Sequence, residues 1–188
     1  MKRLALIALL AVAACRTEVA ELPPPEPMTE TSVGHFCQMN LLEHPGPKAQ
    51  VFLKDVMHPL FFSQVRDAVA YQRMPEQSHE IVTIYVSDMG AAPSWEHPGE
   101  TNWIGAADAY YVTGSRRAGG MGAAELVPFG TEQGARAFAA ENGGEVRRLD
   151  DITTAEVLSP EGPADTTPLD ADEGGYADRL RRLGTQGG

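Results

Sequence analysis

The sequence predicts an α+β fold made of two pseudo-repeated β-β-α-type units, in which short strands alternate with two amphipathic helices. Apolar residues recur at helical spacing in two segments, 59–73 and 131–141, and short β-branched or aromatic runs lie around them. In each half a glycine, Gly46 or Gly122, precedes a predicted strand and then a predicted helix. We therefore expect one domain over 34–158 with a duplicated unit inside it.

The first half of this domain contains two predicted strands around one predicted helix. Residues 49–53 are expected to form a strand. A helix is expected over 59–73, with a buried face formed by Phe61, Val65, Ala68 and Val69. Pro59 fits the first turn of such a helix, and Pro75 lies just beyond its end. Residues 81–86, IVTIYV, are too few for a typical helix and predict a central strand.

The second half repeats the alternation. Strands are expected over 107–113 and 125–129, and Pro128 predicts that the latter lies at an edge or a bulge. Thr131 is a predicted N-cap for the helix that ends at residue 141. The sequence Asn-Gly-Gly that follows is a strong stop signal, after which 145–149 is expected to return as a last strand.

The N-terminal residues 1–14 predict a signal peptide. Lys2 and Arg3 precede an unbroken apolar run over 4–13, and ten residues are too few to span a bilayer, which takes about 20. The small residues before Cys15 resemble the lipobox of bacterial lipoproteins, so we expect Cys15 to be acylated and to hold the chain on a membrane without crossing it. The alternative is ordinary cleavage nearby, with Cys15 lost or left as a plain thiol.

Two further segments flank the domain. Residues 15–33 hold the lipidated cysteine and a Pro-rich stretch with little to pack, which predicts a semi-rigid, extended tether. Residues 159–188 mix Pro, Gly, Asp and Thr with almost no aliphatic periodicity. They predict an acidic and largely disordered tail, with a short helical segment expected only at 176–183.

Composition excludes some classes of function. Lys and Arg number 15 against 26 Asp and Glu, a net charge of −11, which argues against binding to nucleic acid. Two cysteines are too few for a disulfide framework. If Cys15 is lipidated, Cys37 is left as one ordinary thiol in an exported chain. It is then an intermolecular disulfide partner, a nucleophile, a metal ligand or a small buried hydrophobe.

Cys37 and Met39 place a thiol and a thioether two residues apart. On an extended or turning backbone both sulfurs can face one point. Thiolate and thioether are soft donors that select Cu(I) over hard cations and suit zinc poorly. Met39 alone could instead fill a gap in the core, and Cys37 could be an inert buried thiol.

Met121 is the best candidate for a third donor. It is flanked by glycines on both sides, so it has no neighbouring side chains to pack against and is displayed by a flexible backbone. It could instead be a mobile loop residue. His35 is a weaker candidate for a fourth donor, because a lone histidine is more often a surface or capping side chain.

Several of these segments together resemble the NosL family. The resemblance covers roughly 34–150 and is carried by the lipobox, His-Phe-Cys-Gln-Met at 35–39, His-Pro-Gly-Pro-Lys-Ala-Gln at 44–50, the aromatic segment 103–112, Met121 and Phe129. It implies paired β-β-α units and copper ligands at Cys37, Met39 and Met121. It also implies a lipid-anchored protein of a bacterial cell-envelope membrane that faces the periplasm. Such a protein is a Cu(I) chaperone for nitrous-oxide reductase and works with the ABC-type NosDFY membrane complex.

Two other classes of function remain beside a copper carrier that works by ligand exchange. One is a metal-free lipoprotein interaction module in which Cys37 is structural. The other is a thiol-dependent enzyme with Cys37 as nucleophile. Nucleophilic use needs an activating base or a partner thiol, and the sequence has no C-x-x-C motif, so we expect a binding protein and not an enzyme.

Overall fold

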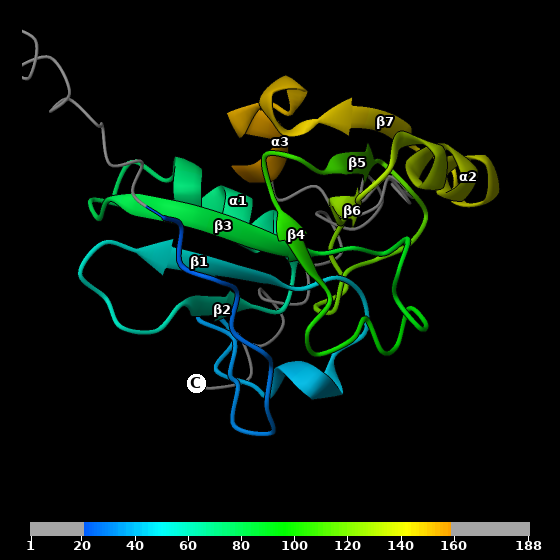
Figure 1. Cartoon of the computed structure of the whole chain (residues 1–188). Helices are drawn as coiled ribbons and strands as arrows, with labels where there is room; N and C mark the ends of the chain where they lie inside the picture. The colour runs from blue at the N-terminus through cyan, green and yellow to red at the C-terminus, as the bar shows by residue number, and fades with distance from the viewer. Residues whose placement is uncertain (1–20, 159–188) are drawn as a thin grey trace, which may run out of the picture.

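The computed structural model describes residues 21–158, and within this range the chain forms two antiparallel sheets with helices packed against them (Figure 1). The predicted α+β class is confirmed. The first sheet has the order β2-β1-β3-β4, with β1 at Ala49–Leu53, β2 at Leu60–Phe62, β3 at Ile81–Ser87 and β4 at Trp103–Gly105. The second has the order β6-β5-β7, with β5 at Tyr110–Thr113, β6 at Val127–Phe129 and β7 at Glu145–Arg148. The predicted signal peptide, Cys15 and the tail lie outside the described residues.

Three α-helices and two short 3-10 helices complete the described part of the chain. They are α1 (Val65–Arg73), α2 (Glu132–Asn142), α3 (Thr154–Leu158), η1 (Leu41–Glu43) and η2 (Leu149–Asp151). Figure 1 shows α1 against the first sheet and α2 beside the second. Over residues 21–158 no helix has the length and apolar character needed to cross a membrane.

The main core lies between the first sheet and α1. Side chains with at most 1 % of their surface exposed meet there from both layers, among them Val51, Phe62, Val65, Val69 and Val86. Burying an aliphatic or aromatic side chain of this size stabilises the fold by about 1.5–3 kcal/mol. A smaller core between the second sheet and α2 contains Val112, Val127, Phe129 and Ala135.

The predicted helix over 59–73 is wrong in its first part. Residues 60–62 form strand β2, and the helix begins at Val65. Phe61 is opposite Gln50 and Phe62 opposite Ala49 on β1, so these residues satisfy their backbone hydrogen bonds in the sheet. Aromatic residues fit a half-buried pleated surface well, and pairing with β1 favours a strand over a helix at residues 60–62.

Most other predicted elements are confirmed, with shifted ends. The strand predicted at 107–113 begins only at Tyr110, and the strand at 125–129 only at Val127. That second strand is an edge strand, as Pro128 predicted. Thr131 caps α2 by accepting a hydrogen bond from Gly134 N at 3.2 Å, and Gly143 ends the helix at φ 75°.

The two sheets have like topologies. In each, a hairpin of two strands is followed by a helix and a third strand, and the first strand of the hairpin lies between the other two. The correspondence pairs β1 with β5 and β2 with β6. It differs from the predicted one, which matched 49–53 with 125–129. This likeness is one of topology alone.

The Pro-rich segment before residue 34 is part of the folded domain, so the expectation that it has little to pack against is wrong for its described part. Glu26 exchanges two hydrogen bonds with the side chain of Gln50 on β1, at 2.9 and 3.0 Å. Tyr85 Oη donates to Pro23 O at 2.8 Å, and Met28 is 2 % exposed. Figure 1 shows this blue segment crossing the first sheet. Because Gln50 is fully buried, its amide requires these backbone partners.

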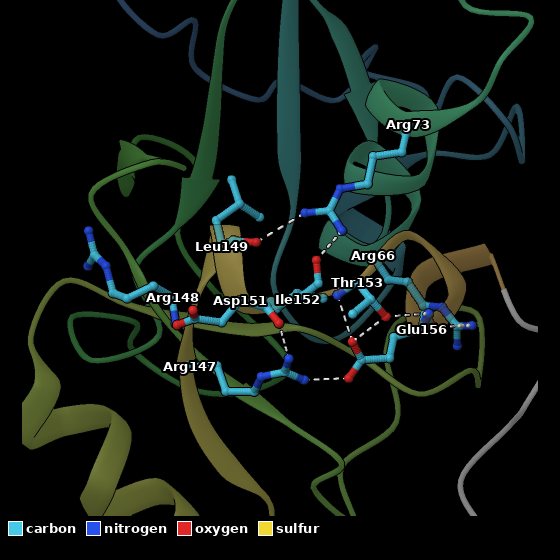
Figure 2. A network of polar contacts seen from close by, with 9 residues as sticks. All are labelled: Arg66, Arg73, Arg147, Arg148, Leu149, Asp151, Ile152, Thr153 and Glu156. Atoms are coloured by element: carbon cyan, nitrogen blue, oxygen red, sulfur yellow. Dashed lines mark hydrogen bonds and ion pairs between the residues drawn. The ribbon is translucent and has the colours of Figure 1, made fainter.

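Arginines of α1 hold the last described segment against the domain (Figure 2). Arg73 donates to Leu149 O at 3.0 Å and also to Ile152 O. Arg66 donates to Glu156 O and Val157 O, both at 3.2 Å. These bonds place Ile152 and Val157 in the main core, where they are 2 % and 4 % exposed.

Candidate metal centre

The segment that carries Cys37 is attached to the free edge of β2. Gly34 forms a parallel β-bridge with Phe61, and His35 N donates to Phe61 O at 2.6 Å. The strand β2 lies between β1 and this segment, since it is hydrogen-bonded to β1 on its other side. The turn around Cys37 is therefore held in place by the sheet.

The turn itself is closed by its own backbone and by one side chain. Gly34 N donates to Met39 O at 3.0 Å, and Gln38 N donates to Gly34 O at 2.8 Å. Gln38 adopts a left-handed φ of 57°, and its side-chain amide donates to His35 O at 2.7 Å. The relative positions of Cys37 and Met39 are thus fixed by hydrogen bonds on both sides of Gln38.

The thiol of Cys37 is half-buried between Gly34 and Ser63. Its Sγ atom lies 3.6 Å from Ser63 Oγ, in hydrogen-bonding contact. A Cβ atom at position 34 would lie only 2.5 Å from Sγ. The absence of a side chain at Gly34 is what allows the thiol to occupy this place.

The two candidate thioethers are on the surface. Met39 is 43 % exposed and Met121 is 45 % exposed, whereas Met28 in the fold interior is 2 % exposed. The alternative that Met39 fills a gap in the core is therefore wrong. An exposed thioether contributes little to packing, so these two methionines are available to a ligand from solvent.

Met121 is the third residue of a four-residue turn. Gly122 N donates to Gly119 O at 2.9 Å, and Gly122 has a left-handed φ of 80°, which favours glycine. A β-bridge between Ala118 and Ala124 closes the base of this small hairpin. The N–H of Met121 donates to Gln64 Oε1 at 2.9 Å.

The loops of Cys37 and Met121 are therefore held by two consecutive residues. Ser63 contacts the thiol, and Gln64 binds the backbone of Met121. A Cβ atom on Gly120 would lie 3.1 Å from Ser63 O, so this second loop also packs against the backbone of the same connection. Both loops meet where β2 ends and α1 begins.

His35 is placed differently from the sulfurs. Its ring lies 5.4 Å from that of Phe36 and 5.5 Å from those of Phe62 and Tyr71, centroid to centroid. Phe36 and Phe62 also contact each other edge to face, at 5.2 Å. The imidazole is part of an aromatic cluster that supports the turn from the side of α1.

Two buried ionisable groups lie beneath the loops. Lys48 is 1 % exposed, and its Nζ atom donates to Pro45 O at 3.0 Å and to Gly46 O at 2.6 Å. Burial lowers the pKa of Lys48 from its ordinary value of 10.5 to about 8, while the charges of Glu125 and Cys37 act in the opposite direction.

Glu125 is the second of these groups. Burial raises its pKa from 4.5 to about 8, against the opposing effect of hydrogen bonds from two backbone N–H groups. Those donors are Arg66 N at 2.9 Å and Leu126 N at 2.8 Å, both to Oε1. Because Arg66 lies in the first turn of α1, Glu125 caps this helix from a distant segment. The other oxygen, Oε2, is buried and has no hydrogen-bond partner within 21–158.

Sequence reasoning missed the residues that join the two loops. Ser63 and Gln64 interrupt an apolar pattern just before a helix, a position where small polar residues usually act as caps. That signal predicts a helix start and nothing about a site. Glu125 gave no signal, because a single acidic residue before a strand is unremarkable until its burial is known.

Clusters of the commoner ligand types do not occur in the described range. Among residues 21–158 no group of three or more His, Cys, Asp or Glu side chains is arranged to hold a metal ion. Methionine sulfur is not among those donor types. The turns beside the start of α1 carry one thiol, that of Cys37, and two exposed methionines, Met39 and Met121.

Comparisons with known proteins agree on one family. The NosL family model matches residues 25–157. The copper-binding lipoprotein NosL of Achromobacter cycloclastes is 53 % identical over 177 residues, covering 94 % of this chain and 91 % of the relative. That of Stutzerimonas stutzeri is 34 % identical over 140 residues, covering 74 % and 72 %. The crystal structure of the copper chaperone NosL from Shewanella denitrificans is similar, with a TM-score of 0.66, 33 % identity and coverage of 71 % and 99 %.

Proposed function

The chain belongs to the NosL family, whose named members are copper-binding lipoproteins and copper chaperones and not enzymes, and from this premise we propose that it carries Cu(I). It takes up the ion on the periplasmic side of a bacterial envelope membrane, where acylated Cys15 holds it. It delivers the ion for the maturation of nitrous-oxide reductase, together with the ABC-type NosDFY complex. The observation that carries the proposal is the attachment of the Cys37 and Met121 loops to adjacent residues, Ser63 and Gln64.

The proposed ligands are the sulfurs of Cys37, Met39 and Met121. One thiolate and two thioethers form a soft donor set, which suits Cu(I) and disfavours hard cations. The turn geometry supports the pairing of Cys37 with Met39, since hydrogen bonds hold the backbone on both sides of them. The packing of His35 among aromatic rings favours a structural role for this residue, and we leave it out of the ligand set.

Release of the ion follows from the exposure of the site. Both thioethers are more than two-fifths exposed, so donors of a receiving protein can approach the ion while it is still bound. A thiolate and Cu(I) have no net charge together, and thioethers are neutral. Exchange of a thioether for a neutral donor of the receiving protein therefore requires no separation of charge. Cys37 leaves as a thiolate, so its replacement requires an anionic donor of the receiving protein, and the free thiolate can then take up a proton from solvent.

Uptake of the ion must displace the proton of the Cys37 thiol, because the thiolate is the metal ligand. Copper affinity is therefore expected to rise with pH wherever the thiol is protonated in the free protein. The two thioethers bind no proton and contribute no pH dependence of their own.

Anaerobic reconstitution of the mature chain, made without its lipid, tests the proposal. Mass spectrometry under native conditions is expected to show one copper per chain, and competition with a Cu(I) chelator measures the affinity. Cys37→Ser should abolish tight binding, and Met39→Ala and Met121→Ala should weaken it. Met57→Ala is the matched control, because Met57 is 85 % exposed and lies in the β1–β2 loop. Tight binding retained by Cys37→Ser would refute the ligand assignment.

Alkylation of Cys37 distinguishes the copper carrier from the alternative, a metal-free interaction module. If Cys37 binds copper, its alkylation by a small reagent should proceed in the free protein and stop when one equivalent of Cu(I) is added. A thiol that reacts at the same rate with and without copper would favour a structural role for Cys37.

A further inference from the structure

Gln64 is a buried amide whose position no capping or core role explains. It occupies the N-cap position of α1 with an extended backbone, φ −138° and ψ 142°, yet its side chain makes no capping hydrogen bond. It is 3 % exposed. One of the two backbone N–H groups that a cap could satisfy, that of Arg66, is bound instead by Glu125 Oε1. The amide of Gln64 can therefore bind elsewhere.

The side chain of Gln64 joins α1 to the loop of Met121. Its Oε1 atom accepts the hydrogen bond from Met121 N at 2.9 Å, and its Nε2 atom donates to Asp67 Oδ2 at 3.3 Å. An ionised carboxylate only accepts hydrogen bonds, so Asp67 orients the amide with its oxygen toward Met121. The first turn of α1 thus sets the direction of the bond to the loop.

The loop's own hydrogen bonds, from Gly122 N to Gly119 O and from Gly119 N to Ala123 O, hold the shape of the turn and do not join it to α1. Gly119 and Gly120 precede Met121 and Gly122 follows it, and glycines populate many backbone conformations when unbound. The contacts at Gly119 are close, since a Cβ atom there would lie 2.6 Å from Gln64 Oε1 and also 2.6 Å from Glu125 Oε2. The amide of Gln64 therefore lies against the loop at Gly119 as well as at Met121.

From this geometry we propose that Gln64 is a positioning residue of the copper site. It fixes the backbone of Met121 relative to the turn of Cys37, and in this way it sets the direction of the Met121 thioether. Ser63, the residue next to Gln64, contacts the thiol of that turn. The inference rests on the proposed function. It names the residue that holds the loop of Met121 so that this sulfur can bind the same ion as Cys37 and Met39. Without Gln64 the turn of Met121 loses its hydrogen bond to this residue, and copper binding must fix the turn relative to Cys37 at its own cost in entropy.

The expected effect on affinity is that of losing one ligand's preorganisation. Gln64→Ala should lower the Cu(I) affinity about 3- to 10-fold, the range for one net hydrogen bond. Because Gln64 is proposed to act only through the Met121 thioether, Gln64→Ala and Met121→Ala should not be additive. The double variant is expected to bind Cu(I) as Met121→Ala does.

Methyl NMR of the full mature chain, labelled at its methionine methyl groups, tests the role directly. In the unmodified protein, one equivalent of Cu(I) should shift the signals of Met39 and Met121 and leave that of Met57 unchanged. In Gln64→Ala the signal of Met39 should still shift, while the shift of Met121 should be reduced. Met28 is 2 % exposed, so an unchanged Met28 signal reports that the fold is intact.

The outcomes of this experiment test the positioning role of Gln64 separately from the proposed ligand set. A full Met121 shift in Gln64→Ala would overturn the positioning role and leave the ligand set standing. If neither Met39 nor Met121 shifts in the unmodified protein, the ligand set itself fails. Gln64→Leu, which keeps the buried volume but has no acceptor, gives the same comparison if the alanine variant disturbs Met28.

Discussion

Gly34 and the thiol of Cys37 are in direct contact across their turn. A Cβ atom at position 34 would lie 2.5 Å from Cys37 Sγ, closer than any normal contact. Gly34 does not have a positive φ, so the requirement for glycine comes from space and not from backbone angle. Its N–H and the turn's other bonds hold the backbone while the thiol fills the space beside it.

Gly34→Ala is therefore expected to displace the thiol. The added methyl group should lower the free energy of unfolding by about 1–3 kcal/mol, the usual cost of overpacking. It should also weaken Cu(I) binding, because the thiol of Cys37 can no longer keep its place beside Ser63. Denaturant unfolding and chelator competition measure the two effects. Unchanged copper affinity would show that the thiol binds the ion from another position.

Glu125 should make the protein less stable as the pH rises from about 4.5 to 8. Its pKa is raised to about 8 in the folded chain, so in this interval the unfolded state is ionised while the folded state still holds the proton. Each tenfold difference in proton affinity between the two states corresponds to roughly 1.4 kcal/mol of stability. Below about pH 4.5 and above about pH 8, Glu125 no longer makes the free energy of unfolding depend on pH.

The matched variant is Glu125→Gln, which cannot ionise. The difference in free energy of unfolding between the two proteins, measured at several pH values, isolates this group from the other titrating residues. A difference that stays constant between pH 5 and 8 would contradict the raised pKa of Glu125.

Lys48 should give the opposite slope at higher pH. Its pKa is lowered to about 8 in the folded chain, so between about 8 and 10.5 the unfolded state binds a proton that the folded state does not. Stability should rise with pH in this interval. Lys48→Met should remove that slope while losing the bonds to Pro45 O and Gly46 O, and unfolding curves at pH 8 and 10 measure both effects.

Arg73 should control the stability of the last described segment. Arg73→Ala removes the bonds to Leu149 O and Ile152 O and is expected to cost about 2–3 kcal/mol, since hydrogen bonds from charged donors are strong. Hydrogen exchange should then quicken over 149–158. Arg136→Ala is the control, because Arg136 makes an exposed pair with Glu132 on α2 that contributes less than about 1 kcal/mol. Equal effects of the two variants would contradict this role of Arg73.

Much of the fold follows from local signals. The strands near 49–53 and 81–86 are predictable because β-branched and aromatic residues cluster there, and α2 is predictable from its N-cap and its glycine stop. The family resemblance is also visible in the sequence, because it depends on residue types and their order. Residues 60–62 are misassigned from sequence because their pattern fits one turn of a helix and a short strand equally well.

The sequence by itself determined the fold class, the edge position of Pro128 and the ends of α2, and the sulfur residues that we propose as copper ligands were chosen from it. Only the tertiary structure decided that Glu26 binds Gln50 on β1, that Phe61 and Phe62 pair as a strand, and that Ser63 and Gln64 join two distant loops. The physical reason is that the preference of a segment for helix or strand depends on residues that are neighbours in the sequence. The burial and partner of a polar group such as Gln64 depend instead on residues far away in the chain.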